Sequence, residues 1–388
     1  MKLFLVILAT CIPGLCCGQR VVVSEKHSSS QVYEIDVYAA YKNAKVYSLS
    51  TIAESIEYIP LEKTKDCIIG TDPGNIFITS TDIFVFDFKM CYRFDRNGKF
   101  QNQIGKIGRG PEEVVRPMQV AVDSINQWVY LLDYERLVRY NYEGKFIKAF
   151  NLGFYSGQML SHNSHEVLLD DTFYQHAKPG KRFSAKFFSV DNGKVISNMA
   201  CEKKDKIPFS MCNPPMYKYN GDTFIKDYWD DMIYRVQDAS NLKTYAAIET
   251  GKLKHRDSDD QSPITGKVDP KNKMVIGIDF ISETDRFILL TANKGLFVYN
   301  KNTGETICTE HFKEGEVWNN FTNDVTGGPG TRSNSFPRYS IQNNLLVTYH
   351  NAYEFFDTEG NESSQIKKLK SKLSPDDNPV LALIKIKK

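Results

Sequence analysis

The stretch Tyr92-Arg93-Phe94-Asp95-Arg96-Asn97-Gly98-Lys99-Phe100 decides the fold, because it combines an aromatic-rich strand, a polar turn with glycine and a second short strand. Tight turns between twisted strands need positive φ, which glycine adopts without steric cost. The pattern occurs four more times, at residues 140–146, 190–195, 299–306 and 356–360. The chain is therefore predicted to be an all-β repeat protein.

The spacing of the turn glycines gives the repeat length. Gly98 and Gly144 are 46 residues apart, and Gly193 follows 49 residues later. The next interval, from Gly193 to Gly304, is 111 residues and has room for one more unit, which residues 231–241 supply without the glycine. Repeats of about 40 to 50 residues with four strands each are typical of propeller blades, which bury their faces only against neighbouring blades.

These units predict one domain at residues 46–388, a six-bladed β-propeller with four-stranded blades. The blades are expected at residues 66–104, 113–153, 154–212, 213–255, 272–315 and 333–388. Strand-like sequences at 56–61 and 380–386 are expected to complete one sheet and close the ring without long open edges. The polar stretches 254–273 and 315–335 are interpreted as loop insertions.

The N-terminus indicates export. Residues 1–18 have the positive start, short apolar stretch and small residues of a signal peptide, and that stretch is too short to span a bilayer. Cleavage after Gly18 and lipid attachment at Cys16 or Cys17 are the two alternatives. Either one places the mature chain in the periplasm or at the outer membrane. Residues 19–45 contain no repeat and are predicted to form an exposed leader, and no later segment reaches transmembrane length.

Composition excludes some partners. The formal net charge of +2 and the lack of long basic blocks disfavour binding to nucleic acid. Five cysteines follow the signal segment: Cys67, Cys91, Cys201, Cys212 and Cys308. They are interpreted as buried thiols, with a Cys201–Cys212 disulfide as the alternative.

The sequence resembles the six-bladed β-propeller proteins of Bacteroides-type bacteria, which are related to NHL and TolB-like propellers and are often exported or lipid-anchored. Three stretches carry the resemblance: residues 83–100, the glycine-rich run 104–113 and the terminal segment 374–381. The chain departs from the family pattern at Glu112, where glycine is expected, and at Val114, where an aromatic residue is expected. The resemblance implies the fold, but it says almost nothing about the activity.

Two kinds of ligand contact are predicted. In the run Gly105-Lys106-Ile107-Gly108-Arg109-Gly110-Pro111, glycine amides and Arg109 suit an anion, although a structural connection between blades is the favoured interpretation. Arg109 and Glu112 are the candidate ligand contacts there. Trp229, Asp230, His350 and Tyr353 are candidates for a glycan site, because an aromatic ring packs against a sugar while polar groups bind its hydroxyls. Ordinary hairpin packing is the competing explanation.

Catalysis and metal binding receive less support. His350 and Tyr353 with Arg332 or Arg338 would suit β-elimination from a uronate, if they met in space. The densest set of metal-ligand types, His162, His165, Asp170, Asp171 and His176, has no recognised spacing, so neither a metal nor another cofactor is predicted.

The sequence thus favours a non-catalytic binding or scaffold propeller of the cell envelope that recognises a glycan, peptide or partner protein. A carbohydrate-active lyase or hydrolase with its site in the central funnel is the alternative. Titratable side chains converging there from several blades would favour the enzyme.

Overall fold

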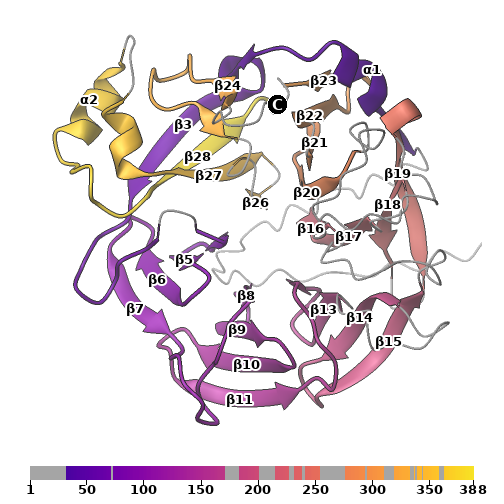
Figure 1. Cartoon of the computed structure of the whole chain (residues 1–388), viewed down its shortest axis with the longest axis vertical. Coiled ribbons are helices and arrows are strands. Elements are labelled where there is room, and N and C mark those ends of the chain that lie inside the picture. Colours follow the sequence, from indigo (N-terminus) through magenta and orange to yellow (C-terminus); the bar gives the residue numbers. More distant parts are fainter. Residues whose placement is uncertain are drawn as a thin grey trace, which may run out of the picture. The chain divides into compact units, whose positions relative to one another are not determined.

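Antiparallel sheets follow one another along the chain in the computed structural model, and six of them form the blades of a propeller (Figure 1). The structure describes residues 32–388 except 71–72, 171–182, 201–214, 227–230, 238–240, 254–275, 293–294, 310–318, 333–335, 337–338, 343 and 358–361. The predicted signal peptide, Cys16 and Cys17 lie outside these residues. None of the described helices is long and apolar enough to cross a membrane.

The first three blades each take four consecutive strands, numbered from the inner to the outer strand. Blade one contains β4 (Asn75–Ile78), β5 (Asp82–Phe86), β6 (Cys91–Asp95) and β7 (Phe100–Ile104). Blade two contains β8 (Gln119–Asp123), β9 (Trp128–Asp133), β10 (Arg136–Asn141) and β11 (Phe146–Asn151). Blade three contains β12 (Met159–Ser161), β13 (Glu166–Asp170), β14 (Phe183–Ser189) and β15 (Lys194–Ala200).

Of the last three blades, blades four and six each include a strand from the N-terminal part of the chain. Blade four contains β16 (Met216–Tyr219), β17 (Asp222–Lys226), β18 (Met232–Val236) and β19 (Leu242–Glu249), with β1 (Tyr33–Asp36) added outside. Blade five contains β20 (Ile278–Glu283), β21 (Phe287–Ala292), β22 (Gly295–Asn300) and β23 (Thr306–Cys308). Blade six contains β26 (Tyr339–Gln342), β27 (Leu345–His350), β28 (Val380–Ile386) and β3 (Ala53–Pro60).

The ring closes as the sequence predicted. β3 pairs antiparallel with β28 from Ala53↔Ile386 to Pro60↔Val380, so strands from both ends of the domain share one blade. The unit without a glycine turn is also confirmed, because β18 and β19 pair around residues 237–241.

Hydrophobic cores lie between neighbouring blades rather than inside single sheets. In β5, Ile83 and Val85 join a core with residues of blade six, whereas Phe84 and Phe86 join a core with residues of blade two. Successive side chains of a strand point to opposite faces of its sheet, so a strand packed on both faces is apolar throughout. This explains why all five residues of β5 are buried.

Two segments differ from the predictions. The exposed leader expected at residues 19–45 is described from Val32 onward, and that part packs against the propeller: β1 pairs in parallel with β19, and Ile35 and Val37 have no exposed surface. The short helix α1 (Val37–Lys42) and the 3-10 helix η1 (Leu49–Thr51) follow. The sequence missed β1 because its four residues carry no turn signal and gain their burial only from blades four and five.

The predicted insertion at 315–335 forms β24 (Asn319–Thr322) and β25 (Thr331–Arg332), which build a three-stranded sheet with β2 (Tyr47–Ser48). The copy of the repeat predicted at 356–360 is not preceded by a strand, because Phe356 follows the 3-10 helix η6 (Ala352–Phe355). Residues 358–360 lie outside the described residues, and α2 (Ser364–Lys370) follows them. A further 3-10 helix, η3 (Gly251–Leu253), follows β19. The other stretch read as an insertion, 254–273, lies outside the described residues.

The three cysteines that the structure describes, Cys67, Cys91 and Cys308, are free and buried. Burial raises the pKa of the Cys67 thiol to about 12, which agrees with the prediction of inert interior thiols. Cys201 and Cys212 lie outside the described residues.

Candidate functional site

In each antiparallel blade, the turn between the second and third strands lies at the same end as the connections that join neighbouring blades. We call this end of the propeller the loop face. Arg109 and Glu112 lie on it in the connection from blade one to blade two, and His350 and Tyr353 lie on it after β27 of blade six. Trp229 and Asp230 lie outside the described residues.

The glycine-rich connection holds a carboxylate of its own. The backbone N–H of Gly110 donates to Oε2 of Glu113 at 2.9 Å, and Lys106 Nζ lies 3.4 Å from Oε1. A β-carbon at Gly108 would lie 1.8 Å from Oε2, so a larger residue there would displace this carboxylate. The amide of Gly110 and the ammonium of Lys106 lower the pKa of Glu113. The sequence suggested that this run could bind an anion. In the structure, the carboxylate of Glu113, from the same loop, occupies that position.

Arg109 and Glu112 are both exposed. Among the described residues, the Arg109 guanidinium has no ion pair or hydrogen bond, so it is available to a ligand. The backbone carbonyl of Glu112 accepts a hydrogen bond from the Tyr140 hydroxyl at 2.7 Å, which fixes the position of the loop on blade two. Val114, where the family pattern has an aromatic residue, is fully buried beneath the connection.

A buried aspartate at the end of the second strand anchors the loop face in two blades. In blade two, Asp133 accepts the backbone N–H groups of Val115 and Arg116 at 3.0 and 2.8 Å. In blade three, Asp170 accepts the N–H groups of Gly157 and Gln158, both at 2.8 Å. From the sequence, Asp170 is a candidate metal ligand, although its place at the end of β13 matches that of Asp133 at the end of β9.

Next to Asp133 lies a group of side chains that was not predicted from the sequence, in which Arg116 and Tyr155 are exposed and Tyr134 and Glu135 are partly buried. We call Arg116, Tyr134, Glu135 and Tyr155 the Tyr134 cluster. The Arg116 guanidinium lies 5.7 Å from the centre of the Tyr134 ring, and Tyr155 meets that ring edge-on at 6.3 Å. The Glu135 carboxylate raises the pKa of the Tyr155 phenol, whose side chain is 40% exposed. An aromatic surface therefore lies beside one hydrogen-bond donor group and one acceptor group.

Tyr134 has an unusual backbone. It is the first residue of the two-residue turn between β9 and β10, and its φ is +53°. A bulky residue rarely adopts this conformation, which glycine adopts without strain. The turn is held by neighbouring backbone, since Ser156 N–H donates to the Tyr134 carbonyl at 3.2 Å and Leu152 N–H donates to the Glu135 carbonyl at 2.7 Å.

Blade one repeats this feature. Phe88 lies in the corresponding turn, between β5 and β6, with a φ of +64° and a side chain that is 56% exposed. Its ring packs on Gly74, where an added β-carbon would lie 2.8 Å from the ring. Two adjacent blades thus hold an aromatic residue in a strained conformation at the loop face.

His350 and Tyr353 differ in accessibility. His350 is 2% exposed, its Nδ1 lies 3.5 Å from Oε2 of Glu354, and its ring meets Phe355 edge-on at 5.8 Å. Tyr353 is 42% exposed and points to solvent from η6. No contact within the described part of the chain joins this pair to Arg109 or Glu112. Arg338 and the side chain of Arg332 lie outside the description, so the elimination arrangement is untested.

The candidate metal ligands are separated. His162 and His165 lie in the turn before β13, whereas Asp170 lies at the far end of that strand. The His162 ring bonds Thr223 Oγ1 at 2.9 Å, and His165 pairs with Asp191 at 2.9 Å. Asp171 and His176 lie outside the described residues, within which no group of three metal-ligating side chains converges.

The ionisable side chains of the innermost strands are mostly used by the fold itself. Asp123 accepts the N–H groups of Ile125 and Asn126, and the ammonium of Lys218 donates to the His162 carbonyl at 2.8 Å. The Asp123 carboxylate and the Lys218 ammonium are therefore bound by backbone groups of the protein itself.

The carboxylate of Glu283, at the end of β20, is fully buried and lies 2.5 Å from Lys301 Nζ. The Tyr217 hydroxyl donates to Glu283 Oε2 at 2.8 Å, and the Tyr245 hydroxyl donates to Oε1. This buried network joins blades four and five and leaves no group of Glu283 for a ligand.

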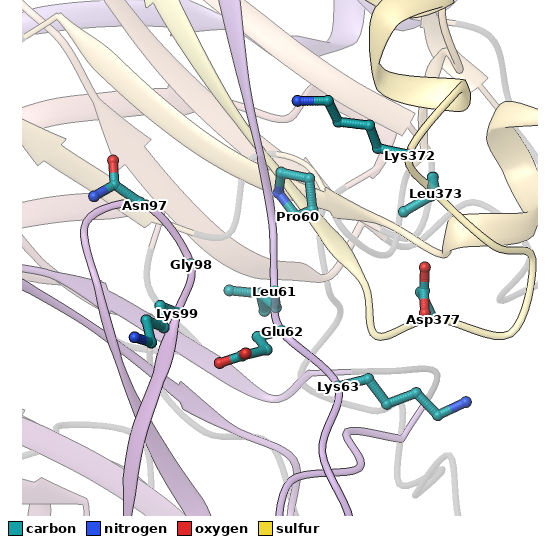
Figure 2. A pocket seen from close by; sticks show the side chains of 10 residues that line it. All are labelled: Pro60, Leu61, Glu62, Lys63, Asn97, Gly98, Lys99, Lys372, Leu373 and Asp377. Carbon is teal, nitrogen blue, oxygen red and sulfur yellow. The ribbon is translucent and has the colours of Figure 1, made fainter.

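A cavity of about 320 Å³ lies beside the closing strand β3, where it meets the β6–β7 turn and the segment before β28 (Figure 2). Lys63, which points away from the cavity in Figure 2, pairs with Asp376 at 2.8 Å. Glu62 is fixed by the Phe100 N–H, which donates to its Oε2 at 2.9 Å. These contacts hold the segment after β3 and the segment before β28 together beside blade one. We therefore interpret the cavity as part of the joint that closes the ring.

The structure defines the protein as a six-bladed β-propeller that exposes the aromatic side chains of Phe88, Tyr155 and Tyr353 on its loop face. The family described as Domain of unknown function (DUF4934) matches residues 32–385, and the chain belongs to that family. The match begins at the first described residue and includes β1, in agreement with the packing of that strand.

One solved structure agrees with the fold, and two others show a weaker likeness. A Bacteroides fragilis protein described as exported has 19% identity and a TM-score of 0.69, with 92% of this chain and 100% of that chain covered. A DUF4221 family member from Bacteroides vulgatus has 13% identity and a TM-score of 0.49, with 86% and 97% covered. Virginiamycin B lyase from Staphylococcus aureus has 10% identity and a TM-score of 0.43, with 85% and 99% covered. No curated protein matches the chain.

Proposed function

We propose that this chain is an exported, non-catalytic binding propeller that recognises a glycan through its loop face, centred on the Tyr134 cluster. The strained backbone of Tyr134 carries the proposal. A bulky residue at positive φ is about 1–2 kcal/mol less favourable than glycine, and such strain concentrates at ligand-binding positions. The turn would form more easily with glycine, so the ring itself has a use on this exposed face.

The chemistry of the cluster suits sugars. An aromatic ring packs on the apolar face of a sugar ring, while the Arg116 guanidinium donates to hydroxyls and the Glu135 carboxylate accepts from them. Arg109 and Glu112 offer a second donor and acceptor from the neighbouring connection, and Tyr353 offers an exposed ring in blade six. Trp229 and Asp230 stay candidate contacts.

The internal contacts of Asp123, Lys218 and Glu283 support binding rather than catalysis, because a catalytic group has to reach its substrate. Export through residues 1–18, followed by either cleavage after Gly18 or lipid attachment at Cys16 or Cys17, and kinship with NHL-type propellers are parts of the same proposal. They place the protein in the periplasm or at the outer membrane.

Binding of the mature chain to an array of glycans and envelope fractions tests the proposal. Tyr134→Gly relaxes the turn and removes the ring, so we expect at least tenfold weaker binding by a protein that is no less stable. Gln127→Gly is the matched control, because Gln127 also has positive φ, at +56°, but lies in the turn at the opposite end of β9. It is expected to bind like the wild type.

Three results would contradict parts of this proposal. Unchanged binding by Tyr134→Gly rejects the cluster as the site. Binding to peptides or an envelope protein but to no glycan rejects the ligand class. Release of unsaturated uronate products, seen by their absorbance, rejects the non-catalytic role and favours a lyase.

A further inference from the structure

The innermost strand of blade five contains a β-bulge at Asp279. Ile278 pairs with Ala292 and Phe280 pairs with Thr291, so Asp279 has no partner in the neighbouring strand. A bulge bends its strand and redirects the side chain of the extra residue. Asp279 and Phe280 are exposed, whereas the other four residues of β20 are buried. The bulge thus turns one carboxyl and one aromatic ring out of the blade interface.

The Asp279 carboxyl has no counter-charge in the described part of the chain. It forms no ion pair or hydrogen bond there, although burial by surrounding atoms raises its pKa. β16, β21 and β26 pack against β20. β21 has no titratable residue, and the side chain of Tyr339 in β26 is not among those described.

The titratable groups of β16 are already bound elsewhere. The ammonium of Lys218 donates to the His162 carbonyl at 2.8 Å, the Tyr217 hydroxyl donates to Glu283, and the Tyr219 hydroxyl donates to Asp285 at 3.0 Å. No described cation therefore neutralises Asp279, which distinguishes it from Glu283 on the same strand, whose counter-charge is Lys301.

A partly desolvated carboxylate without a counter-charge favours a cationic partner, and an adjacent aromatic ring adds attraction to an ammonium or guanidinium group. We propose that Asp279 and Phe280 form a binding point for the ammonium or guanidinium group of a small organic cation at the innermost strand of blade five. This site is independent of the Tyr134 cluster, since it lies in another blade. The negative charge of Asp279 is also opposite to the positive charges of Arg109 and Arg116.

Titration calorimetry of the mature chain with three probes tests the proposal. Glucosamine supplies an ammonium group, agmatine a guanidinium group, and N-acetylglucosamine is the neutral control. We expect at least one of the two cations to bind. Asp279→Asn keeps the shape of the side chain and should weaken that binding at least tenfold. Asp66→Asn, at an exposed aspartate in the connection before blade one, should leave it unchanged.

Thermal stability gives a second readout. The raised pKa means that the folded state favours the protonated carboxyl, so this group loses stability as pH rises through its folded pKa. Asp279→Asn should therefore raise the melting temperature at pH 7 while it weakens cation binding. The absence of cation binding, unchanged affinity in Asp279→Asn, or a lower melting temperature in that variant would each overturn the proposal, the last by showing that the carboxylate has a structural partner.

Discussion

The α-carbon of Gly98 lies against the backbone carbonyl of Pro60, so a β-carbon added to Gly98 would approach that oxygen to 2.1 Å. Pro60 ends the outer strand of blade six, and Gly98 forms the outer turn of blade one. The same contact recurs in the next blade, where a β-carbon at Gly144 would lie 2.6 Å from the Gln103 carbonyl oxygen. Gly98 and Gly144 therefore serve both the hairpin and the joint between blades.

This relationship predicts unequal effects of two similar substitutions. Gly98 and Gly304 both have positive φ, at +83° and +73°, but an added β-carbon at Gly304 has no neighbour within 4 Å. Gly304→Ala should lower the free energy of unfolding by about 1 kcal/mol, the cost of the backbone conformation alone. Gly98→Ala should lower it by about 3 kcal/mol, because the joint with Pro60 must also shift. Equal urea midpoints for the two variants would contradict the role of Gly98 in the joint.

The strain at Tyr134 predicts an inverted order of stability. Alanine would keep the positive φ and lose the ring, whereas glycine would relieve the strain. Tyr134→Gly should therefore be more stable than Tyr134→Ala by about 1 kcal/mol, although glycine usually destabilises a protein relative to alanine. Melting temperatures of the two variants measure this difference, and the usual order would show that the turn is unstrained.

The buried pair of Glu283 and Lys301 predicts a large loss when one partner is removed. Lys301→Met leaves the Glu283 carboxylate without its counter-charge, and such a change costs about 3–5 kcal/mol. Glu283→Gln combined with Lys301→Met should recover part of the loss, because no charge then stays buried. Denaturant unfolding of the single and double variants checks this. A double variant less stable than Lys301→Met would contradict it.

The lowered pKa of His162 predicts that the protein becomes less stable in mild acid. Burial lowers the pKa of its imidazole below the unfolded value of about 6.5, so the unfolded chain binds the proton first as pH falls. Its contribution is present above about pH 6.5 and is lost as pH falls towards the folded pKa. His162→Gln should show a flatter dependence of melting temperature on pH between 7 and 5, and a slope equal to that of the wild type would contradict this origin.

Much of the fold could be predicted because turn glycines and strand periodicity are local properties. Gly98, Gly144, Gly193 and Gly304 all have positive φ, and each lies between the third and fourth strands of its blade. Strand β1 could not be found this way, because its short sequence is stabilised by contacts with blades four and five rather than by a local pattern.

The candidate site was predicted less well. The sequence proposed Arg109, Glu112, His350 and Tyr353 as ligand contacts, and it treated His350 like Tyr353, although His350 is buried and the other three are exposed. It missed Tyr134, because nothing local marks a tyrosine that will adopt positive φ. A usable signal was the aspartate just before it, since Asp133 ends a strand whose other residues are apolar or aromatic.

The sequence by itself determined the repeat, the number of blades and the closure of the ring, because strand periodicity and turn chemistry are fixed by neighbouring residues. Only the tertiary structure decided which polar groups bind partners inside the protein and which stay available to a ligand. Glu113, Asp133 and Glu283 find internal partners, whereas Arg109 and Asp279 find none among the described residues. The reason is that a charged side chain's partners come from segments distant in the sequence, which meet only when the blades have assembled.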